Sequence, residues 1–562
     1  MRGWAIDLGT SNTGIAHWDD ETDAPRWLSL PGLCRDADSD DSLLAPRLIP
    51  SATEVLPARG FFEQLGRNGT LSRHFFFGQW AWIGRPALER NQGHARPGFA
   101  RTFKTLLGRA PLHTLARLGA RPITAREVAR CFVRELLAET KRQTGERIRD
   151  LVVTTPVEAY ESYRMEVVRL FAQLGCERVR CLDEPVAAAL GYGIGFERRR
   201  LILVVDFGGG TLNIALVQLE PNRAEQGSAK IIAKAGALLG GNDVDGWLAD
   251  ELCQRFGYDL AAEPDDIWRN LLVEEARRVK EEIYFKGQAT FFATLPEELR
   301  KFEARLGGPA TASEITREDL TDLITRRGVY RAIEECLSSI ETQSRAAAHP
   351  LESVDDVLMV GGSTLLPGVY SLFQARFGRE RVRAFQPFEA VAYGASAFSA
   401  GRLTQSDFIV HDYAFLTHDV KSHEPAYTTI VPAGTRFPTA PDFWKRQLVP
   451  TCSQGTSETL FKLVVCEIGR NSGQTGRFGW DAKGNVHALG EPAANSASKY
   501  VVKLNESNPT LGFLDPPHQP QDRAPRLEIT FGVNAERWLI ASVRDLKTGK
   551  ALMTEESVVR LI

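Results

Sequence analysis

The segment LILVVDFGGGTLNIA, residues 201–215, contains an apolar run, an aspartate, three glycines, a threonine and a second apolar run. A similar arrangement, WAIDLGTSNTGIA, occupies residues 4–16, about 200 residues earlier. Continuous apolar runs are typical of strands that are buried on both faces. The β-branched residues after each glycine turn predict a second strand. Two such strand–turn–strand units predict that this part of the protein consists of two related lobes.

The element that follows each glycine turn distinguishes these units from other phosphate-binding folds. A P-loop or a dinucleotide-binding fold places a helix after its glycine-rich loop. Here alternating and β-branched residues follow, and neither turn contains the pattern GxxxxGK[ST]. We therefore expect two β-hairpins rather than a P-loop or a Rossmann unit.

Both turns carry the groups that a nucleoside triphosphate and its metal ion require. Glycines allow backbone N–H groups to approach phosphate oxygens closely, and Thr10 and Thr211 can add hydroxyl donors. Asp7 and Asp206 end the first strand of each hairpin, so both carboxylates can face a cleft between the lobes. Mg²⁺ is commonly held through carboxylates and water. Glu184, at the start of an expected helix, can orient a water for hydrolysis.

Helices and strands alternate around the two hairpins, and the pattern changes near residue 405. Residues 124–143 predict an amphipathic helix, and residues 150–156 predict a buried strand that ends at a proline. Downstream of residue 405, short alternating runs separated by Pro, Gly, Asn and Ser predict an all-β region. Residues 509–526, which contain five prolines, are expected to form a long loop. Residues 32–78 are expected to form irregular loops, and no function is assigned to them.

Composition excludes several classes of protein. Lys and Arg total 68 against 71 Asp and Glu, a net charge of −3, so we expect binding neither to nucleic acid nor to a membrane. The eight cysteines form no CxxC pair and have no zinc-ligand spacing. No secretory signal and no apolar run of about 20 residues is visible. We expect reduced thiols and a cytoplasmic location.

Six motifs, in order along the chain, resemble those of the seventy-kilodalton heat-shock chaperone family, within the actin-like ATPase superfamily. The two hairpins resemble its two phosphate motifs, and VGGST at residues 360–364 resembles its adenosine motif. DEPVAAALGYG at residues 183–193 and AVAYGA at residues 390–395 resemble its connecting helices. Residues 152–164 resemble the segment whose proline and arginine couple nucleotide state to the adjoining domain. The similarity covers residues 1–403.

The resemblance implies a domain organisation. An α/β two-lobed actin-like ATPase domain would occupy residues 1–403, with lobe I at about 1–195 and 368–403 and lobe II at about 196–367. A linker at residues 404–415 would join it to an all-β, substrate-binding-like domain at residues 416–562, without the family's helical lid. The segments of this tail that carry the resemblance are residues 430–439, 527–531 and 545–550. An unrelated β-sandwich is the alternative for the tail.

The resemblance also assigns roles to residues at matching motif positions. Asp7, Lys104, Glu184 and Asp206 would be catalytic. Asp7 and Asp206 would organise Mg²⁺ through water, Lys104 would reach the γ-phosphate, and Glu184 would position the attacking water. Pro156 and Arg164 would couple nucleotide state to the neighbouring domain. The implied nucleotide-binding residues are Gly9, Thr10, Ser11, Asn12, Gly208, Gly209, Gly210, Thr211, Gly240, Gly241, Glu274, Arg277, Arg278, Gly361, Gly362 and Ser363.

Two positions depart from the family pattern, and so does the linker. The family commonly has serine at the position of Glu281 and arginine at that of Leu365, so nucleotide affinity is expected to differ. The family's acidic, leucine-rich linker is here DFIVHD, residues 407–412, which keeps only the acid–apolar–acid order.

The function that the resemblance implies is that of a stress-response chaperone. It would bind and hydrolyse ATP to ADP with Mg²⁺, and so control how the β-domain binds unfolded or extended polypeptides. Co-chaperones and a nucleotide-exchange factor would be further partners. An ATP-gated scaffold with one dedicated protein partner and little hydrolysis is the main alternative. Phosphotransfer to a small molecule and a filament-forming actin relative are two more.

Overall fold

The computed structural model describes most of the chain, in two compact units, Met1–Gln405 and Ser406–Ile562. The described residues are 3–36, 46–58, 78–92, 96–107, 110–157, 161–193, 198–220, 227–256, 266–293, 311–384, 389–406, 409, 411–418, 425–452, 456–470, 477–480, 486–489, 499–505, 509–534 and 537–561. The two units are described separately below.

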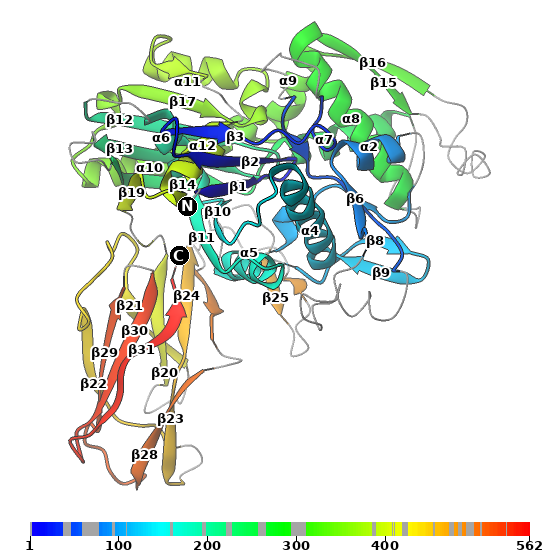
Figure 1. The fold of residues 1–562 in the computed structure, drawn as a ribbon. Coiled ribbons are helices and arrows are strands. Elements are labelled where there is room, and N and C mark those ends of the chain that lie inside the picture. Colours follow the sequence, from blue (N-terminus) through cyan, green and yellow to red (C-terminus); the bar gives the residue numbers. More distant parts are fainter. Residues whose placement is uncertain are drawn as a thin grey trace. The chain divides into compact units, whose positions relative to one another are not determined.

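The first hairpin lies at the centre of a mixed sheet, named here the β1 sheet (Figure 1). Strand β1 pairs in parallel with β10 and antiparallel with β2, as the sequence predicts for a hairpin. Along the sheet the order is β11 (Arg178–Asp183), β10 (Asp150–Thr155), β1 (Trp4–Leu8), β2 (Asn12–Asp19) and β3 (Ala24–Trp27), with β4 (Ile49–Pro50) paired to β2.

The second hairpin lies at the centre of a corresponding sheet, the β12 sheet. Strand β12 pairs in parallel with β17 and antiparallel with β13, which repeats the arrangement around β1. The order is β18 (Val382–Arg383), β17 (Asp356–Val360), β12 (Arg200–Phe207), β13 (Leu212–Glu220), β14 (Gly227–Ala237) and β19 (Leu403–Ser406). Each sheet belongs to its own apolar core cluster, so the first unit has two lobes.

The helices of the first unit cover these sheets. Thr124 caps α4 by accepting a hydrogen bond from the N–H of Glu127, as the sequence predicts. A Cβ on Gly394 would lie 1.9 Å from the carbonyl oxygen of Ala187, so α6 and α12 pack with their backbones in contact. The helices are α2 (Arg85–Asn91), α3 (Lys104–Leu107), α4 (Ala125–Thr144), α5 (Glu161–Gln173), α6 (Glu184–Gly193), α7 (Gly241–Arg255), α8 (Asp266–Lys286), α9 (Arg317–Arg326), α10 (Val329–Ala346), α11 (Val369–Phe377) and α12 (Ala390–Ser399), with 3₁₀ turns η4 (Leu351–Ser353) and η5 (Gly362–Leu365).

Short strands complete the first unit. They are β5 (Thr53–Val55), β6 (Ala81–Ile83) and β7 (Phe99–Ala100), the hairpin β8 (Thr114–Leu118) and β9 (Arg121–Thr124), and the hairpin β15 (Gln288–Ala293) and β16 (Thr311–Thr316). Strands β4 and β5 lie within residues 32–78, where irregular loops were expected. Residues 37–45 and 59–77 of that stretch lie outside the described residues.

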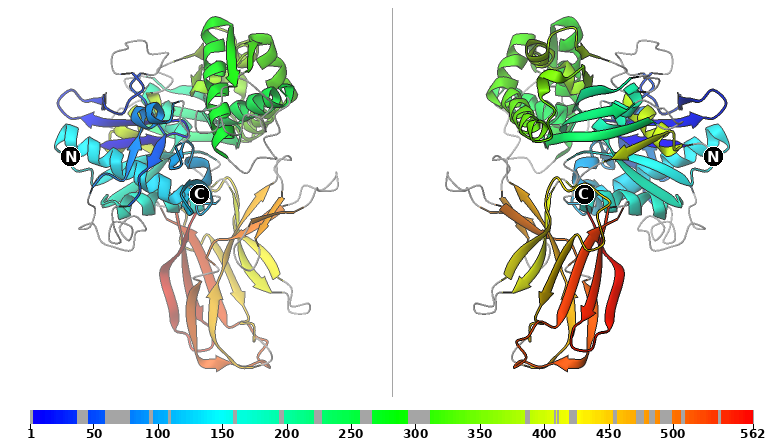
Figure 2. Two further views of the ribbon diagram at one scale, coloured as in Figure 1. Left: turned by 90° about the vertical axis from the view of Figure 1, so that its right-hand side faces the viewer. Right: turned by 90° about the vertical axis from the view of Figure 1, so that its left-hand side faces the viewer.

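The described residues of the second unit form strands and the segments that connect them, and none of them is helical. Figure 2 draws this unit as strands. Two four-stranded sheets contribute to one apolar core that includes Phe415, Val465, Phe531 and Val543. The first has the order β21 (Pro425–Val431), β20 (Asp412–His418), β24 (Val465–Arg470), β27 (Lys499–Lys503), and the second has the order β22 (Trp444–Leu448), β29 (Leu527–Val533), β30 (Trp538–Asp545), β31 (Ala551–Arg560). Two further pairs are β23 (Glu458–Leu463) with β28 (Thr510–His518), and β25 (Arg477–Trp480) with β26 (Val486–Leu489).

The prediction of a long loop at residues 509–526 is wrong for the first half of that segment. Strand β28 occupies Thr510–His518 and pairs with β23. Its residues alternate between exposed and buried positions, and Leu514 is buried in the core. This alternation favours a strand, and Pro516 and Pro517 stand only near its end.

The proposed linker at residues 404–415 is partly described. Strand β19 ends at Ser406 and β20 begins at Asp412, while residues 407, 408 and 410 lie outside the described residues. In the described part of the chain, none of the helices combines the length and apolar character needed to span a bilayer.

Candidate functional site

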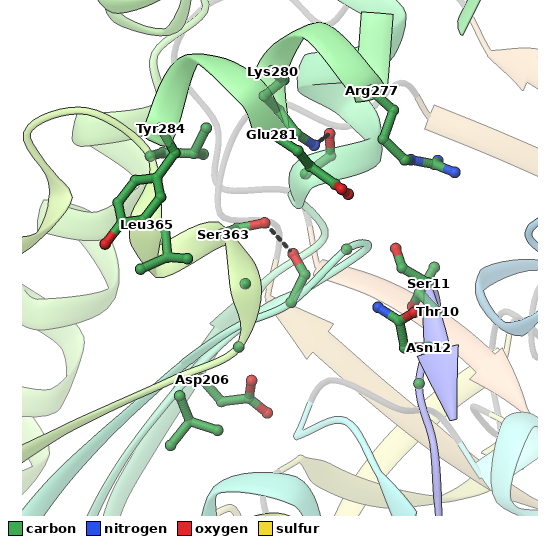
Figure 3. Close-up of a pocket in the computed structure, with 18 of the residues that line it drawn as sticks. Thr10, Ser11, Asn12, Asp206, Arg277, Lys280, Glu281, Tyr284, Ser363 and Leu365 are labelled. Carbon is green, nitrogen blue, oxygen red and sulfur yellow. Dashed lines mark hydrogen bonds between the residues drawn. The ribbon is translucent and has the colours of Figure 1, made fainter. Parts of the chain in front are cut away.

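A cavity of about 610 Å³ opens in the first unit where the two glycine turns meet (Figure 3). Residues 9–12 line it from the β1 sheet, and Gly208, Gly209 and Thr211 line it from the β12 sheet. The carboxyl ends of β1, β12 and β17 all reach this cavity. In α/β folds such ends are the usual location of a ligand site.

Two aspartates, the half-buried Asp7 and the buried Asp206, line the cavity from opposite lobes. Asp7 accepts a hydrogen bond of 2.6 Å from the Thr154 hydroxyl, and Asp206 is 7% exposed. Burial raises the pKa of Asp7. Burial, followed by the negative charges of Glu184 and Asp7, raises the pKa of Asp206 well above its ordinary value. A cation between these carboxylates would lower both pKa values, because it would stabilise the ionised forms.

These two aspartates fit a magnesium ion that keeps part of its water shell. Mg²⁺ is usually bound through one or two carboxylates, water and substrate phosphates, rather than by a cage of protein ligands alone. The described residues contain no group of three or more His, Cys, Asp or Glu side chains that could hold a metal ion by themselves. Asp7 and Asp206 would hold such an ion, since both carboxylates line the cavity.

Lys104 and Glu184 form a buried ion pair beside the aspartates. Lys104 is the first residue of α3, Glu184 is the first residue of α6, and both line the cavity. The Lys104 Nζ contacts Glu184 Oε1. Burial raises the pKa of Glu184, although Lys104 opposes this. Burial opposes the charge of Lys104, but Glu184, Tyr163 and Asp7 together outweigh it and raise the pKa of Lys104, so the ammonium stays charged.

The second glycine turn is fixed by hydrogen bonds to its carbonyl groups. The Ser363 hydroxyl donates to the carbonyl of Gly208 at 2.7 Å (Figure 3). The N–H of Gly241 donates to the same carbonyl, and that of Asn242 donates to Gly209. A Cβ on Gly240 would lie 2.4 Å from backbone atoms of Gly209 and Gly210, so only glycine fits where α7 begins.

The first glycine turn is fixed in the same way and also reaches the opposite lobe. The Ser51 hydroxyl donates to the carbonyl of Gly9 at 2.8 Å. The Ser11 hydroxyl donates to Asn242 Oδ1 at 3.2 Å. Because Asn242 lies at the start of α7, this bond joins the β1 hairpin to the lobe of the β12 sheet.

Two cationic residues of helix α8, Arg277 and Lys280, line the cavity and pair with the same aspartate. Asp245 of α7 is fully buried, and it pairs with Arg277 at 2.9 Å and with Lys280 at 2.6 Å. Arg277 also donates to Asn242 Oδ1, and Lys280 donates to the carbonyl of Gly241. Both side chains are thereby held beside the second glycine turn (Figure 3).

Two ion pairs join α8 to the lobe of the β1 sheet. Arg35 contacts Glu281 at 2.9 Å, and both line the cavity. Arg101 contacts Glu274. Burial and the neighbouring charge of Arg277 lower the pKa of Arg101 to about 10. Arg35 and Lys280 hold the pKa of the exposed Glu281 carboxylate below its ordinary value.

Most of the residues assigned from the sequence line this one cavity. They are Asp7, Gly9, Thr10, Ser11, Asn12, Lys104, Glu184, Asp206, Gly208, Gly209, Thr211, Gly241, Arg277, Gly361, Gly362 and Ser363. The motif around Lys104 continues into residues 108 and 109, which lie outside the described residues.

Other assigned residues lie around the cavity rather than on its wall. Gly210 and Gly240 lie against each other beside the second turn. Glu274 pairs with Arg101 and Arg277. Arg278 pairs with Glu275 and Glu282 on the exposed side of α8. Arg277 lines the cavity, and Arg278 is not among the residues that line it.

The two residues assigned to coupling, Pro156 and Arg164, are not among the residues that line the cavity. Pro156 follows β10 directly, and the N–H of the next residue, Val157, donates to Asn213 Oδ1 at 3.0 Å. Arg164 of α5 pairs with the buried Asp183, the residue before Glu184.

Several cavity residues were missed by sequence reasoning. Lys280 and Tyr284 follow Arg277 at helical spacing, so the period of α8 could have identified them. Phe285, Arg317 and Tyr370 also line the cavity. Arg35 lies in the segment where only irregular loops were expected, and nothing in the sequence signals its pairing with Glu281.

Comparison with known proteins gives matches within one family. A family model described as "Hsp70 protein" matches residues 109–467, more than half of the chain. Two curated proteins named "Chaperone protein DnaK", from two strains of Thermus thermophilus, are each 28% identical over 327 residues. Each alignment covers 56% of this chain and 50% of the relative, so the chain spans about half the length of the curated relatives it matches.

Proposed function

The chain belongs to the Hsp70 family, and from this premise we propose that it is a chaperone whose first unit binds ATP with Mg²⁺ and hydrolyses it to ADP and phosphate. One observation carries this proposal. Asp7, Lys104, Glu184 and Asp206 come from four separate elements, and all four side chains line one cavity between two glycine turns. Family resemblance assigned the same four residues to catalysis.

Each group in the cavity has a defined task in this reaction. The backbone N–H groups of the two turns and the hydroxyls of Thr10 and Thr211 bind the phosphates. Asp7 and Asp206 hold the metal ion through water, and the ion neutralises phosphate charge when bound. Glu184 orients a water toward the terminal phosphorus. The new P–O bond forms as the bond to ADP breaks, and Lys104 stabilises the charge on the phosphoryl oxygens.

The nucleoside is expected to lie on the α8 side of the cavity. Gly361, Gly362 and Ser363 of the loop after β17 reach this side, together with Arg277 and Lys280. Leu365 and Tyr284 add apolar surface there (Figure 3). The base of the nucleotide would stack against Leu365 and Tyr284 rather than against charged side chains.

The second unit is proposed to bind extended or unfolded polypeptides. Its sequence resembles the family's substrate-binding domain at residues 430–439, 527–531 and 545–550. It also exposes two large apolar side chains of strand β28, Phe513 at 70% and Leu511 at 46%, which offer apolar contacts to a bound polypeptide. Pro156 and Arg164 are proposed to couple the two activities. Co-chaperones and a nucleotide-exchange factor are proposed as further partners.

The test is ATP hydrolysis by the full chain, with and without an unfolded peptide. We expect Mg²⁺-dependent hydrolysis that the peptide stimulates, because binding at one unit shifts the state of the other. Absence of hydrolysis under all conditions would contradict the ATPase proposal. Hydrolysis that no unfolded peptide changes would contradict the coupling between the units.

A further inference from the structure

Asn213 contacts Glu184 and Thr211, and it has no role in the mechanism proposed above. It is the second residue of β13, it is 1% exposed, and it is paired with Asp206 in the β12–β13 register. Residues directly opposite each other in an antiparallel pair project from the same face. The Asn213 amide therefore lies on the same side of the sheet as the Asp206 carboxylate.

The hydrogen bonds of Asn213 determine the orientation of its amide. Its Oδ1 accepts from the N–H of Val157 at 3.0 Å. A backbone N–H can only donate, so the oxygen must face Val157 and the nitrogen must face the other way. The nitrogen donates to Glu184 Oε2 at 3.3 Å and to Thr211 Oγ1 at 3.1 Å.

Both oxygens of Glu184 are consequently occupied by donors from different lobes. Lys104 contacts Oε1 and Asn213 contacts Oε2, which sets the plane of the carboxylate. The orientation of Asn213 depends in turn on the backbone after Pro156. One buried amide thus connects the end of β10 with Glu184 and with Thr211 of the glycine turn.

We propose that Asn213 is a positioning residue for ATP hydrolysis, which holds the Glu184 carboxylate in the plane that orients the attacking water. This inference rests on the proposed function. Two donors on one carboxylate remove its rotational freedom, and such pre-organisation matters to the rate of the chemical step rather than to nucleotide affinity. Loss of one hydrogen bond to a charged group corresponds to about a tenfold change in rate.

The experiment measures kcat, KM and the dissociation constant for ATP in the full chain. Asn213→Ala is expected to lower kcat about tenfold and to leave KM and the dissociation constant within about twofold of the wild type. Asn213→Ser keeps an oxygen near the N–H of Val157 but lacks the amide donors, so it is expected to lose activity similarly while disturbing the fold less.

A second buried amide on the same strand provides the matched control. Gln218 is 3% exposed, and its side chain bonds to Arg199 and Glu220, which do not line the cavity. Gln218→Ala should leave kcat within about twofold of the wild type. Equal losses in the Asn213 and Gln218 variants would overturn the proposal, because they would indicate a general effect on the strand.

The outcomes separate this inference from the proposed function. If the wild type hydrolyses ATP and both Asn213 variants keep its kcat, the positioning role is refuted and the ATPase proposal stands. If the wild type does not hydrolyse ATP, both are overturned. A markedly lower kcat at unchanged affinity, with Gln218→Ala unaffected, supports the positioning role.

Discussion

Replacing Asp183 by asparagine is expected to lower the melting temperature of the first unit by about 4–6 °C. Asp183 ends β11 and is fully buried. One of its oxygens pairs with Arg164, and the other lies 3.0 Å from the Nζ of Lys234, which is itself buried. Arg164 belongs to α5 beside the β1 sheet and Lys234 to β14 of the β12 sheet, so this cluster crosses between the lobes.

The magnitude follows from the charges that the substitution leaves behind. Asparagine removes the anion and leaves two buried cations, and removing one member of a buried ion pair costs about 3–5 kcal/mol. For the residues Met1–Gln405, the entropy of unfolding is about 0.85 kcal/mol per kelvin. Dividing this free-energy cost by the entropy of unfolding gives a shift of about 4–6 °C in the melting temperature.

The assay is scanning calorimetry of the full chain, with two further variants for comparison. Lys234→Met leaves Asp183 paired with Arg164, so its shift should be smaller than that of Asp183→Asn. Glu177→Gln disrupts an exposed pair with Arg149, 3.3 Å apart, and should shift the transition by less than about 1 °C. A shift for Asp183→Asn no larger than that of Glu177→Gln would refute the reasoning.

Three more predictions concern the cavity and the second unit. Lys104→Met should reduce kcat by at least about a hundredfold in a phosphate-release assay, because the phosphoryl oxygens lose their cation; activity near the wild-type level would exclude that role. Arg35→Ala should speed release of a fluorescent ATP analogue a few-fold in stopped-flow experiments, since it removes the ion pair with Glu281; an unchanged rate would show that this pair does not restrain the nucleotide. In the second unit, burial would raise the pKa of Asp545, but hydrogen bonds from Arg526 and the backbone outweigh it and lower that pKa. Ionised Asp545 therefore stabilises the fold above about pH 4, the pKa range of an unfolded aspartate, and this contribution is lost as pH falls through the lower folded value. Asp545→Asn should abolish that part of the acid dependence in urea unfolding; equal pH dependence of both proteins would contradict the assignment.

The sequence was sufficient to predict the two hairpins because their signal is local. Continuous apolar residues on each side of a glycine turn predict buried strands, and the registers of β1 with β2 and β12 with β13 match that prediction. The cap at Thr124 is equally local, since it depends on residues three apart.

The remaining features depend on distant parts of the chain. Arg35 contributes to the cavity only because its segment lies near α8, 246 residues further along at Glu281, and no local pattern encodes that approach. Arg278 was assigned through motif position, which carries no information on its ion pairs with Glu275 and Glu282. Strand β28 was not predicted because the prolines of this segment indicate a loop, whereas the alternation of residues 510–514 indicates a strand.

The central claim is that aspartates from opposite lobes jointly organise the metal-bound triphosphate. The most direct measurement is single-turnover ATP hydrolysis by the full chain and by its Asp206→Asn variant, with nucleotide binding measured in parallel. We expect the wild type to convert bound ATP to ADP with Mg²⁺ present, and the variant to bind ATP without converting it. Hydrolysis by the variant at the wild-type rate would contradict the account.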